Sequence, residues 1–335
     1  MSKTNEFVSA APHPQNNDFL YSLETLSTDD VVPPHRKRIQ SGSVSVFAVS
    51  KLAIILLCVA IFVYCVSELS GIVTDYRVGE DLYGDISKEF NSYVNGSTDG
   101  NVSQLQLSAS DVPMANYADV LVGGAPIYEP VLGNVDRVSS AKFQARLAVI
   151  QKLSVRNGDT FGYIQIPNSK IDYPVVHCAN NDYYLTHAFD GHPSAVGAIF
   201  VDYRNNKNIE DNQNVIIYGH NMMNGSMFCD ATKYLEKDFF MNPENKIEIT
   251  TFDGHYTFEV FSAYATSKYD NYFRTGFSSD AEFVKFCYDR EAKSYYHREN
   301  VSFTPDDLII TLSTCILGND DGRYAIHAKL VKVEK

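Results

Sequence analysis

The longest apolar segment of the chain runs from Val44 to Val66, and Lys51 is its only charged residue. Roughly 20 such residues are needed to cross a bilayer as a helix. The basic cluster from His35 to Arg38 precedes the segment, and the positive-inside rule assigns that side to the cytoplasm. We therefore predict a single transmembrane helix over residues 43–67, with the N-terminus cytoplasmic and the rest of the chain extracellular.

A cleaved signal peptide and a buried core helix are the alternatives for this segment. Signal peptides have a short charged start and a small-residue cleavage site, whereas a long polar tail precedes this segment and no such cleavage pattern follows it. Residues 1–42 lack hydrophobic periodicity and are predicted to be a disordered tail. Residues 68–134 have a mixed composition and are predicted to be an extracellular stalk or linker. One folded domain is expected over residues 135–335.

Short segments of strand-forming residues recur between turn signals after Thr160. Eight such segments with irregular connections favour a mainly β fold, a closed or nearly closed barrel. Alternation in the last segment places Ile326 in the core and His327 on the solvent face. The predicted strands cover residues 161–166, 172–176, 198–203, 214–218, 246–251, 256–265, 308–314 and 324–333.

Three helices are expected around this β pattern. Apolar positions between Val135 and Leu153 keep helical spacing and predict a helix that leads into the domain. A shorter helix is predicted from Asp230 to Phe239. A late helix begins after Ser279, which forms a capping-box pattern with Glu282.

Composition narrows the class of protein. Hydrophobic residues make up 44% of the 335 residues, enough for one sizeable core. The chain has 22 Tyr and 20 Phe but no Trp, which agrees with a β-rich domain. The formal net charge of -13 argues against a nucleic-acid-binding protein, because such proteins concentrate Lys and Arg to neutralise phosphates.

Candidate chemistry lies at the ends of three predicted strands. Cys315 follows one strand, Arg323 opens the next after a loop predicted over residues 316–322, and His220 follows the strand that ends at Tyr218. Connectivity alone places Cys315 and Arg323 at one rim, whereas only the tertiary fold can bring His220 there. Acyl transfer through a cysteine requires a thiolate, which a nearby imidazolium and guanidinium favour. His220 would return the proton to the leaving amine, and Arg323 would stabilise the oxyanion or hold a substrate carbonyl.

Structural explanations compete with this interpretation. Four cysteines lie outside the predicted membrane segment, so two disulfides are arithmetically possible, and Cys287 is expected in the core. Zinc is a poor fit because no C-x-x-C or H-x-x-x-H pair occurs, and no metal or other cofactor is expected. Four further histidines are placed in loops or turns and are expected to be solvated rather than catalytic: His177, His187, His192 and His255.

Several segments, in order along the chain, carry a resemblance to a known family. The stretch from about Leu153 to Val333 closely resembles the class B sortases, membrane-anchored cysteine transpeptidases of the Gram-positive cell surface. It covers more than half of the chain and implies the eight-stranded sortase barrel, N-terminal helices and the late helix that marks class B. The matching segments are residues 162–167, 171–176, 181–185, 197–205, 218–221, 270–274 and 311–315.

The resemblance also implies a reaction and its partners. Cys315 would attack the Thr carbonyl of an Asn-Pro-x-Thr-like sorting signal on a surface protein. A peptidoglycan amine would then resolve the thioacyl enzyme, which is expected to be a monomer. Aromatic and aliphatic side chains suit an extended peptide lying across a sheet. The groove residues carried over by position are Asn181, Leu185, Tyr272, Phe273 and Ser313.

The chain departs from the family pattern at three positions, where Tyr163 replaces a frequent Trp, Ala188 a frequent Asp, and Ile316 a frequent polar or acidic residue. Polymerisation of pilins is an alternative role within the family. A cysteine peptidase or an L,D-transpeptidase is a second enzymatic alternative, although the latter has a Ser-His-Gly-Cys pattern that the residues before Cys315 do not match. The third alternative function is a non-catalytic surface protein that is anchored in the membrane.

Overall fold

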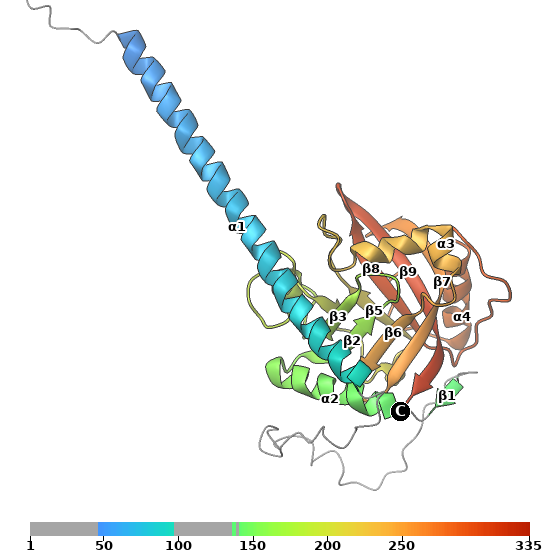
Figure 1. The fold of residues 1–335 in the computed structure, drawn as a ribbon. Helices are drawn as coiled ribbons and strands as arrows, with labels where there is room; N and C mark the ends of the chain where they lie inside the picture. The colour runs from blue at the N-terminus through green and yellow to red at the C-terminus, as the bar shows by residue number, and fades with distance from the viewer. Residues whose placement is uncertain (1–45, 97–135, 139–140) are drawn as a thin grey trace, which may run out of the picture. The chain divides into compact units, whose positions relative to one another are not determined.

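The computed structural model of the chain describes residues 46–96, 136–138 and 141–335 (Figure 1). The chain divides into two compact units, Met1–Val59 and Ala60–Lys335. The predicted tail over residues 1–42 and residues 97–134 of the predicted linker lie outside the described residues.

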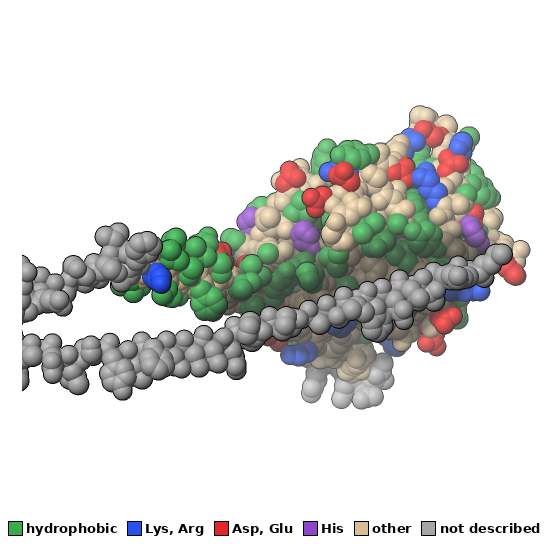
Figure 2. All heavy atoms as spheres, turned by 90° about the horizontal axis from the view of Figure 1, so that it is seen from above, with side chains coloured by type: hydrophobic (Ala, Val, Ile, Leu, Met, Phe, Trp, Pro, Cys, Tyr) green, Lys and Arg blue, Asp and Glu red, His purple; other side chains and the backbone are tan. Residues whose placement is uncertain are grey.

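Helix α1 (Val46–Gly96) carries the apolar segment. It is the one helix in the described part of the chain that is long and apolar enough to cross a membrane. Its side chains from Leu52 to Val66 are exposed, and hydrophobic side chains cover this part of the helix in Figure 2. A helix that is apolar on every side needs a protein core or lipid around it, and none of the described residues covers this segment.

The second part of α1 belongs to the folded domain. Tyr83, Ile86 and Phe90 follow helical spacing and have exposed fractions of 4%, 0% and 0%. The Phe90 ring stacks on Tyr163, with centroids 3.9 Å apart. Burying Ile86 and Phe90 stabilises the fold by roughly 1.5–3 kcal/mol each. This face of the helix, which lies within the predicted linker, thus contributes to the core of the barrel.

Eight strands close into the predicted barrel in the order β9-β7-β6-β2-β3-β4-β5-β8, because β8 pairs again with β9. The pairs β3–β4 and β5–β8 are parallel. A short strand, β1 (Asp136–Val138), pairs with the end of β9. The eight predicted strands are confirmed as β2 (Thr160–Gln165), β3 (Asp172–Val176), β4 (Ile199–Val201), β5 (Asn214–Tyr218), β6 (Ile247–Thr251), β7 (His255–Ser267), β8 (Ile309–Ile316) and β9 (Asn319–Glu334).

The leading and the late predicted helices are present. The helix predicted from Asp230 to Phe239 is instead a 3₁₀ helix followed by a short α-helix, interrupted at Glu236, whose backbone is extended. Helix α4 (Asp280–Glu291) is capped by Ser279, whose side chain accepts a hydrogen bond from the backbone N–H of Glu282. The Glu282 carboxylate accepts from the N–H of Ser278, one residue earlier than a capping box requires. The other helical segments are α2 (Ala141–Arg156), α3 (Lys237–Met241) and the short 3₁₀ helices η3 (Tyr183–Leu185), η4 (Ile209–Asp211) and η5 (Cys229–Leu235).

Three histidines predicted to face solvent are buried. His327 is fully buried because α4 covers the outer face of β9, and its ring meets that of Phe286. Thr311 and Tyr264 hydrogen-bond its two ring nitrogens at 2.8 and 3.1 Å. Burial lowers the pKa of His327 to about 3. The predictions for His255 and His177 are wrong in the same way, with exposed fractions of 2% and 8%.

Candidate active site

Cys315 and Arg323 are direct neighbours across two paired strands. Strands β8 and β9 form a hairpin in which Cys315 is the partner of Arg323 and Ile316 is the partner of Asn319. The loop predicted over residues 316–322 is therefore wrong, because the chain turns at residues 317–318 and a β-bulge takes up the residues before Arg323. Because Cys315 and Arg323 are directly opposite in this register, the thiol and the guanidinium extend from the same face of the hairpin.

The bulge also orients Arg323. Its Nη1 donates to the carbonyls of Asp320 and Gly322 at 3.0 and 2.7 Å. Among the described residues, Nε and Nη2 make no hydrogen bond. These two nitrogens are donors that remain for a bound ligand.

Strand β5 brings His220 to this rim because it runs parallel to β8, with Tyr218 opposite Ser313. The N–H of Gly219 donates to the Ser313 carbonyl at 3.3 Å, and the Asn221 side chain donates to the Cys315 carbonyl at 3.0 Å. Both neighbours of His220 are therefore tied to β8, one of them at Cys315 itself. The structure brings together the three residues that the sequence placed at strand ends.

A backbone carbonyl orients the imidazole. Nε2 of His220 lies 2.8 Å from the carbonyl oxygen of Leu185, at the end of η3. A carbonyl only accepts hydrogen bonds, so Nε2 carries a proton in this contact, and Nδ1 makes no hydrogen bond among the described residues. This contact performs the orienting task that an Asp performs in a Ser-His-Asp triad. Sequence reasoning found no third group for His220, because a main-chain atom has no residue signature.

Tyr272 and Ser313 form a buried pair behind Cys315. Their hydroxyls are 2.8 Å apart, and their exposed fractions are 2% and 3%. Burial raises the pKa of Tyr272, while the charge of Arg323 acts to lower it and that of Cys315 to raise it. The phenol is therefore within electrostatic reach of both groups. Its ring meets Phe273 edge-on, with centroids 5.1 Å apart.

Asn181 and Leu185 offer different groups to a bound peptide. Leu185 has an exposed fraction of 39% and offers an apolar side chain at the surface. The Asn181 side chain donates to Asp202 at 3.0 Å and accepts from the N–H of Tyr203 at 3.0 Å. Asn181 thus holds the start of η3 in place. Its other amide hydrogen has no partner among the described residues and is available to a ligand.

Asp202 is a residue of the site that sequence reasoning missed. Its carboxylate is fully buried and accepts from Arg204, Tyr218 and Asn181. Burial opposes its ionisation, but the hydrogen bonds and charge of Arg204 and the hydroxyl of Tyr218 together lower the pKa of Asp202. Arg204 also donates to the Phe273 carbonyl at 3.1 Å. One buried carboxylate therefore links the segments that carry Asn181 and Phe273. Its only signal in the sequence was a charged residue, Asp202, near the end of the predicted strand over residues 198–203.

The three positions that depart from the family pattern have different surroundings. Tyr163 and Ala188 are buried, with exposed fractions of 1% and 3%, so they are packing positions. Ile316 is half-buried on the same strand as Cys315. It is the one departure beside the thiol.

The cysteines are free. All six lie within the described residues, and the two disulfides that were arithmetically possible are absent. Cys287 is buried in the core as predicted, whereas Cys315 is half-buried at the rim. In the part of the chain that the structure describes, no three His, Cys, Asp or Glu side chains are grouped to hold a metal ion. A reduced thiol, an oriented imidazole and a guanidinium are the groups that cysteine acyl transfer requires.

Comparison with known proteins agrees with this chemistry. Residues 164–331 match a family model described as Sortase domain. Sortase B of Listeria monocytogenes is 40% identical over 185 residues, which cover 54% of this chain and 72% of that protein. The solved structure of sortase B from Bacillus anthracis in complex with AAEK1 is 30% identical with a TM-score of 0.56, over 78% of this chain and 100% of that one. A Staphylococcus aureus sortase B–substrate complex is 34% identical with a TM-score of 0.51, over 55% of this chain and 85% of that one.

Proposed function

Because this chain belongs to the sortase family and is a cysteine transpeptidase of the class B kind, we propose that it cleaves an Asn-Pro-x-Thr-like sorting signal after Thr and joins the new acyl end to a peptidoglycan amine. One observation carries the assignment of residues. The β5–β8–β9 register brings Cys315, His220 and Arg323 to one rim of the barrel.

The first half-reaction uses these side chains in sequence. The Cys315 thiolate attacks the Thr carbonyl carbon, and a C–S bond forms while the carbonyl oxygen becomes an oxyanion. Arg323 donates to that oxyanion through the nitrogens that the hairpin leaves free. The C–N bond then breaks, and the His220 imidazolium gives its proton to the leaving amine. A thioester on Cys315 and a free amine are the products of this step.

The second half-reaction reverses the roles. The acceptor amine attacks the thioester carbonyl carbon, and His220 takes up the proton that the amine loses as the new C–N bond forms. The C–S bond breaks and the thiolate of Cys315 is restored. Leu185 O keeps the imidazole in one orientation through both steps.

The signal peptide would lie across the rim between two walls. On the side beside Cys315, half-buried Phe273 would contact the peptide, and the buried Tyr272–Ser313 pair would support this wall from beneath rather than touch the peptide as the resemblance implied. Leu185 and Asn181 would form the other wall. An extended peptide gains affinity from main-chain contacts and specificity from alternate side chains. The free amide hydrogen of Asn181 and the exposed Leu185 side chain provide one polar and one apolar contact.

A peptide panel tests this proposal. We expect the full chain in detergent micelles to cleave an Asn-Pro-x-Thr peptide at least about tenfold faster than the same residues in shuffled order, since the groove reads alternate side chains. Adding triglycine, or a stem peptide with a free side-chain amine, should yield a ligated product by mass spectrometry. Cleavage without any ligated product would favour a cysteine peptidase, and ligation only to a lysine-bearing pilin peptide would favour pilus polymerisation.

We also propose that α1 anchors a monomer in the cell membrane, with residues 1–42 cytoplasmic and the barrel extracellular. The support is the exposed apolar segment of α1 and the basic residues that precede it in the sequence. Epitope tags attached at Met1 and at Lys335 test the orientation on protoplasts. An antibody should bind the Lys335 tag on intact protoplasts and the Met1 tag only after lysis. Binding to the Met1 tag before lysis would contradict the proposed orientation.

A further inference from the structure

Tyr83 of α1 reaches the loop that contacts the His220 imidazole. This contact loop comprises residues 184–198. The Tyr83 hydroxyl donates to the carbonyl of Gly197 at 2.6 Å and accepts from the N–H of Phe189 at 3.1 Å. The tyrosine is buried, with an exposed fraction of 4%, and burial raises the pKa of Tyr83, so the hydroxyl keeps its proton. One side chain of α1 therefore ties together two distant points of the contact loop.

Gly197 is in turn packed against the imidazole. Its φ of +62° lies in the left-handed region, and a Cβ added there would come within 2.6 Å of the Tyr184 carbonyl oxygen and 3.1 Å of His220 Cδ2. The neighbouring Leu185 carbonyl is the one that holds Nε2 of His220. A displacement of Gly197 would consequently move both contacts of the ring.

A second connection runs from Tyr83 to the loop that His220 begins. This histidine loop comprises residues 219–228. The Tyr83 ring meets Tyr173 edge-on with centroids 5.4 Å apart, and the Tyr173 hydroxyl accepts from the N–H of Met227 at 3.0 Å. The N–H of Phe228 then donates to the His220 carbonyl at 2.8 Å. A chain of direct contacts therefore connects α1 with the backbone of His220.

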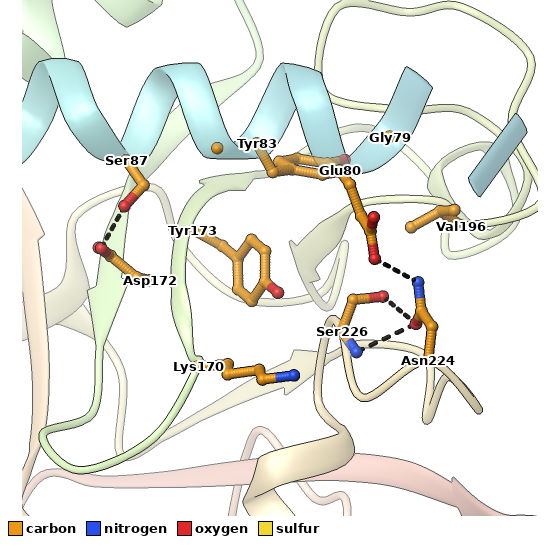
Figure 3. Close-up of a pocket in the computed structure, with 11 residues that line it drawn as sticks. Gly79, Glu80, Tyr83, Ser87, Lys170, Asp172, Tyr173, Val196, Asn224 and Ser226 are labelled. Atoms are coloured by element: carbon orange, nitrogen blue, oxygen red, sulfur yellow. Dashed lines mark hydrogen bonds between the residues drawn. The ribbon is translucent and has the colours of Figure 1, made fainter. Parts of the chain in front are cut away.

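The contacts of α1 with the histidine loop lie around a cavity of about 210 Å³, drawn in Figure 3. Tyr83 and Tyr173 lie at this cavity, as do Asn224 and Ser226 of the histidine loop. Glu80, one turn before Tyr83, accepts a hydrogen bond from the Asn224 side chain at 3.0 Å. Because the cavity separates α1 from the histidine loop, a few bridging side chains carry the contact rather than continuous packing.

We propose that Tyr83 is a positioning residue for His220, holding the contact loop through its hydroxyl and the histidine loop through its ring. The inference rests on the proposed catalytic role of His220. It gives the helix that carries the apolar segment a direct influence on the reaction. A change in how α1 packs would alter the placement of the imidazole beside Cys315.

The test compares Tyr83→Phe with Tyr93→Phe in the full chain in detergent micelles. Tyr93 is a matched control, because it lies on the same helix and its hydroxyl bonds Lys152, away from both loops. We expect Tyr83→Phe to lower kcat for peptide cleavage about tenfold with KM changed less than about twofold, since placement of the acid–base group is affected and the groove is not. Tyr93→Phe should match the wild type.

A second readout does not depend on turnover. Iodoacetamide alkylation of Cys315, followed by peptide mass spectrometry across pH, reports how well the imidazolium supports the thiolate. Relative to the wild type, the midpoint of the alkylation rate against pH should move to higher pH in Tyr83→Phe and stay unchanged in Tyr93→Phe. If the wild type cleaves no sorting peptide, the proposed function fails while this profile still tests the positioning. Equal kcat values and equal midpoints in the two variants would overturn the inference.

Discussion

Replacing Cys315 by alanine is expected to abolish both peptide cleavage and ligation, with a loss of at least about 10⁴-fold. Removing the sulfur removes the atom to which the acyl group is attached, and Cys315 is the one cysteine of the β8–β9 hairpin, opposite Arg323. Burial raises the pKa of Cys287 to about 12 and also raises the pKa of Cys229. The rate of release of the C-terminal peptide fragment, followed by chromatography, provides the measurement.

Cys229→Ala is the matched control for this variant. Cys229 is also a free, half-buried cysteine, but it lies in η5. The Cys229→Ala variant should cleave the peptide at the wild-type rate and unfold at the wild-type temperature. Cys315→Ala should also keep that unfolding temperature. Peptide cleavage by a folded Cys315→Ala variant would remove the proposed nucleophile.

Replacing His220 by alanine should lower kcat by about 10²–10⁴-fold, the usual contribution of a general acid–base group. KM should change little, because the side chains proposed to form the groove walls are retained. The loss has two sources: the leaving amine receives no proton, and the thiolate loses its imidazolium partner. Steady-state kinetics on the Asn-Pro-x-Thr peptide measure both parameters.

His192→Ala is the control for the histidine variant. His192 is exposed in the same region and pairs with Asp190 at 3.0 Å, but it makes no contact with His220 among the described residues. It should retain wild-type kinetics. A His220→Ala enzyme with unchanged kcat would show that another group moves the protons.

Short segments of strand-forming residues between turn signals were sufficient to predict the barrel, because eight of them with irregular connections favour a closed sheet. For the last strand, alternation was also used to assign residues to the inner and outer faces. The same rule was wrong for His327. Alternation assigns a residue to the outer face but cannot show that α4, distant in the sequence, covers that face. The Tyr83–Ile86–Phe90 pattern in α1 was visible at helical spacing, but the mixed composition around it favoured a linker.

The candidate site was predictable only in part. Connectivity was sufficient to place Cys315 beside Arg323, although the bulge between them depends on backbone geometry that no residue pattern specifies. The position of His220 depends on the parallel β5–β8 register, which is a property of the whole barrel. The Leu185 carbonyl and the buried Asp202 network emerge only from the folded chain, since main-chain atoms and buried ion pairs leave no characteristic spacing.

The most direct test of the central claim is the mass of the enzyme during the reaction. The full chain is mixed with an Asn-Pro-x-Thr peptide without an acceptor amine, quenched in acid and analysed by intact mass spectrometry. The account predicts a mass increase equal to the acyl part of the peptide, located by digestion to the fragment that contains Cys315 and removed by hydroxylamine. Turnover with no adduct, or with an adduct on another residue, would contradict it.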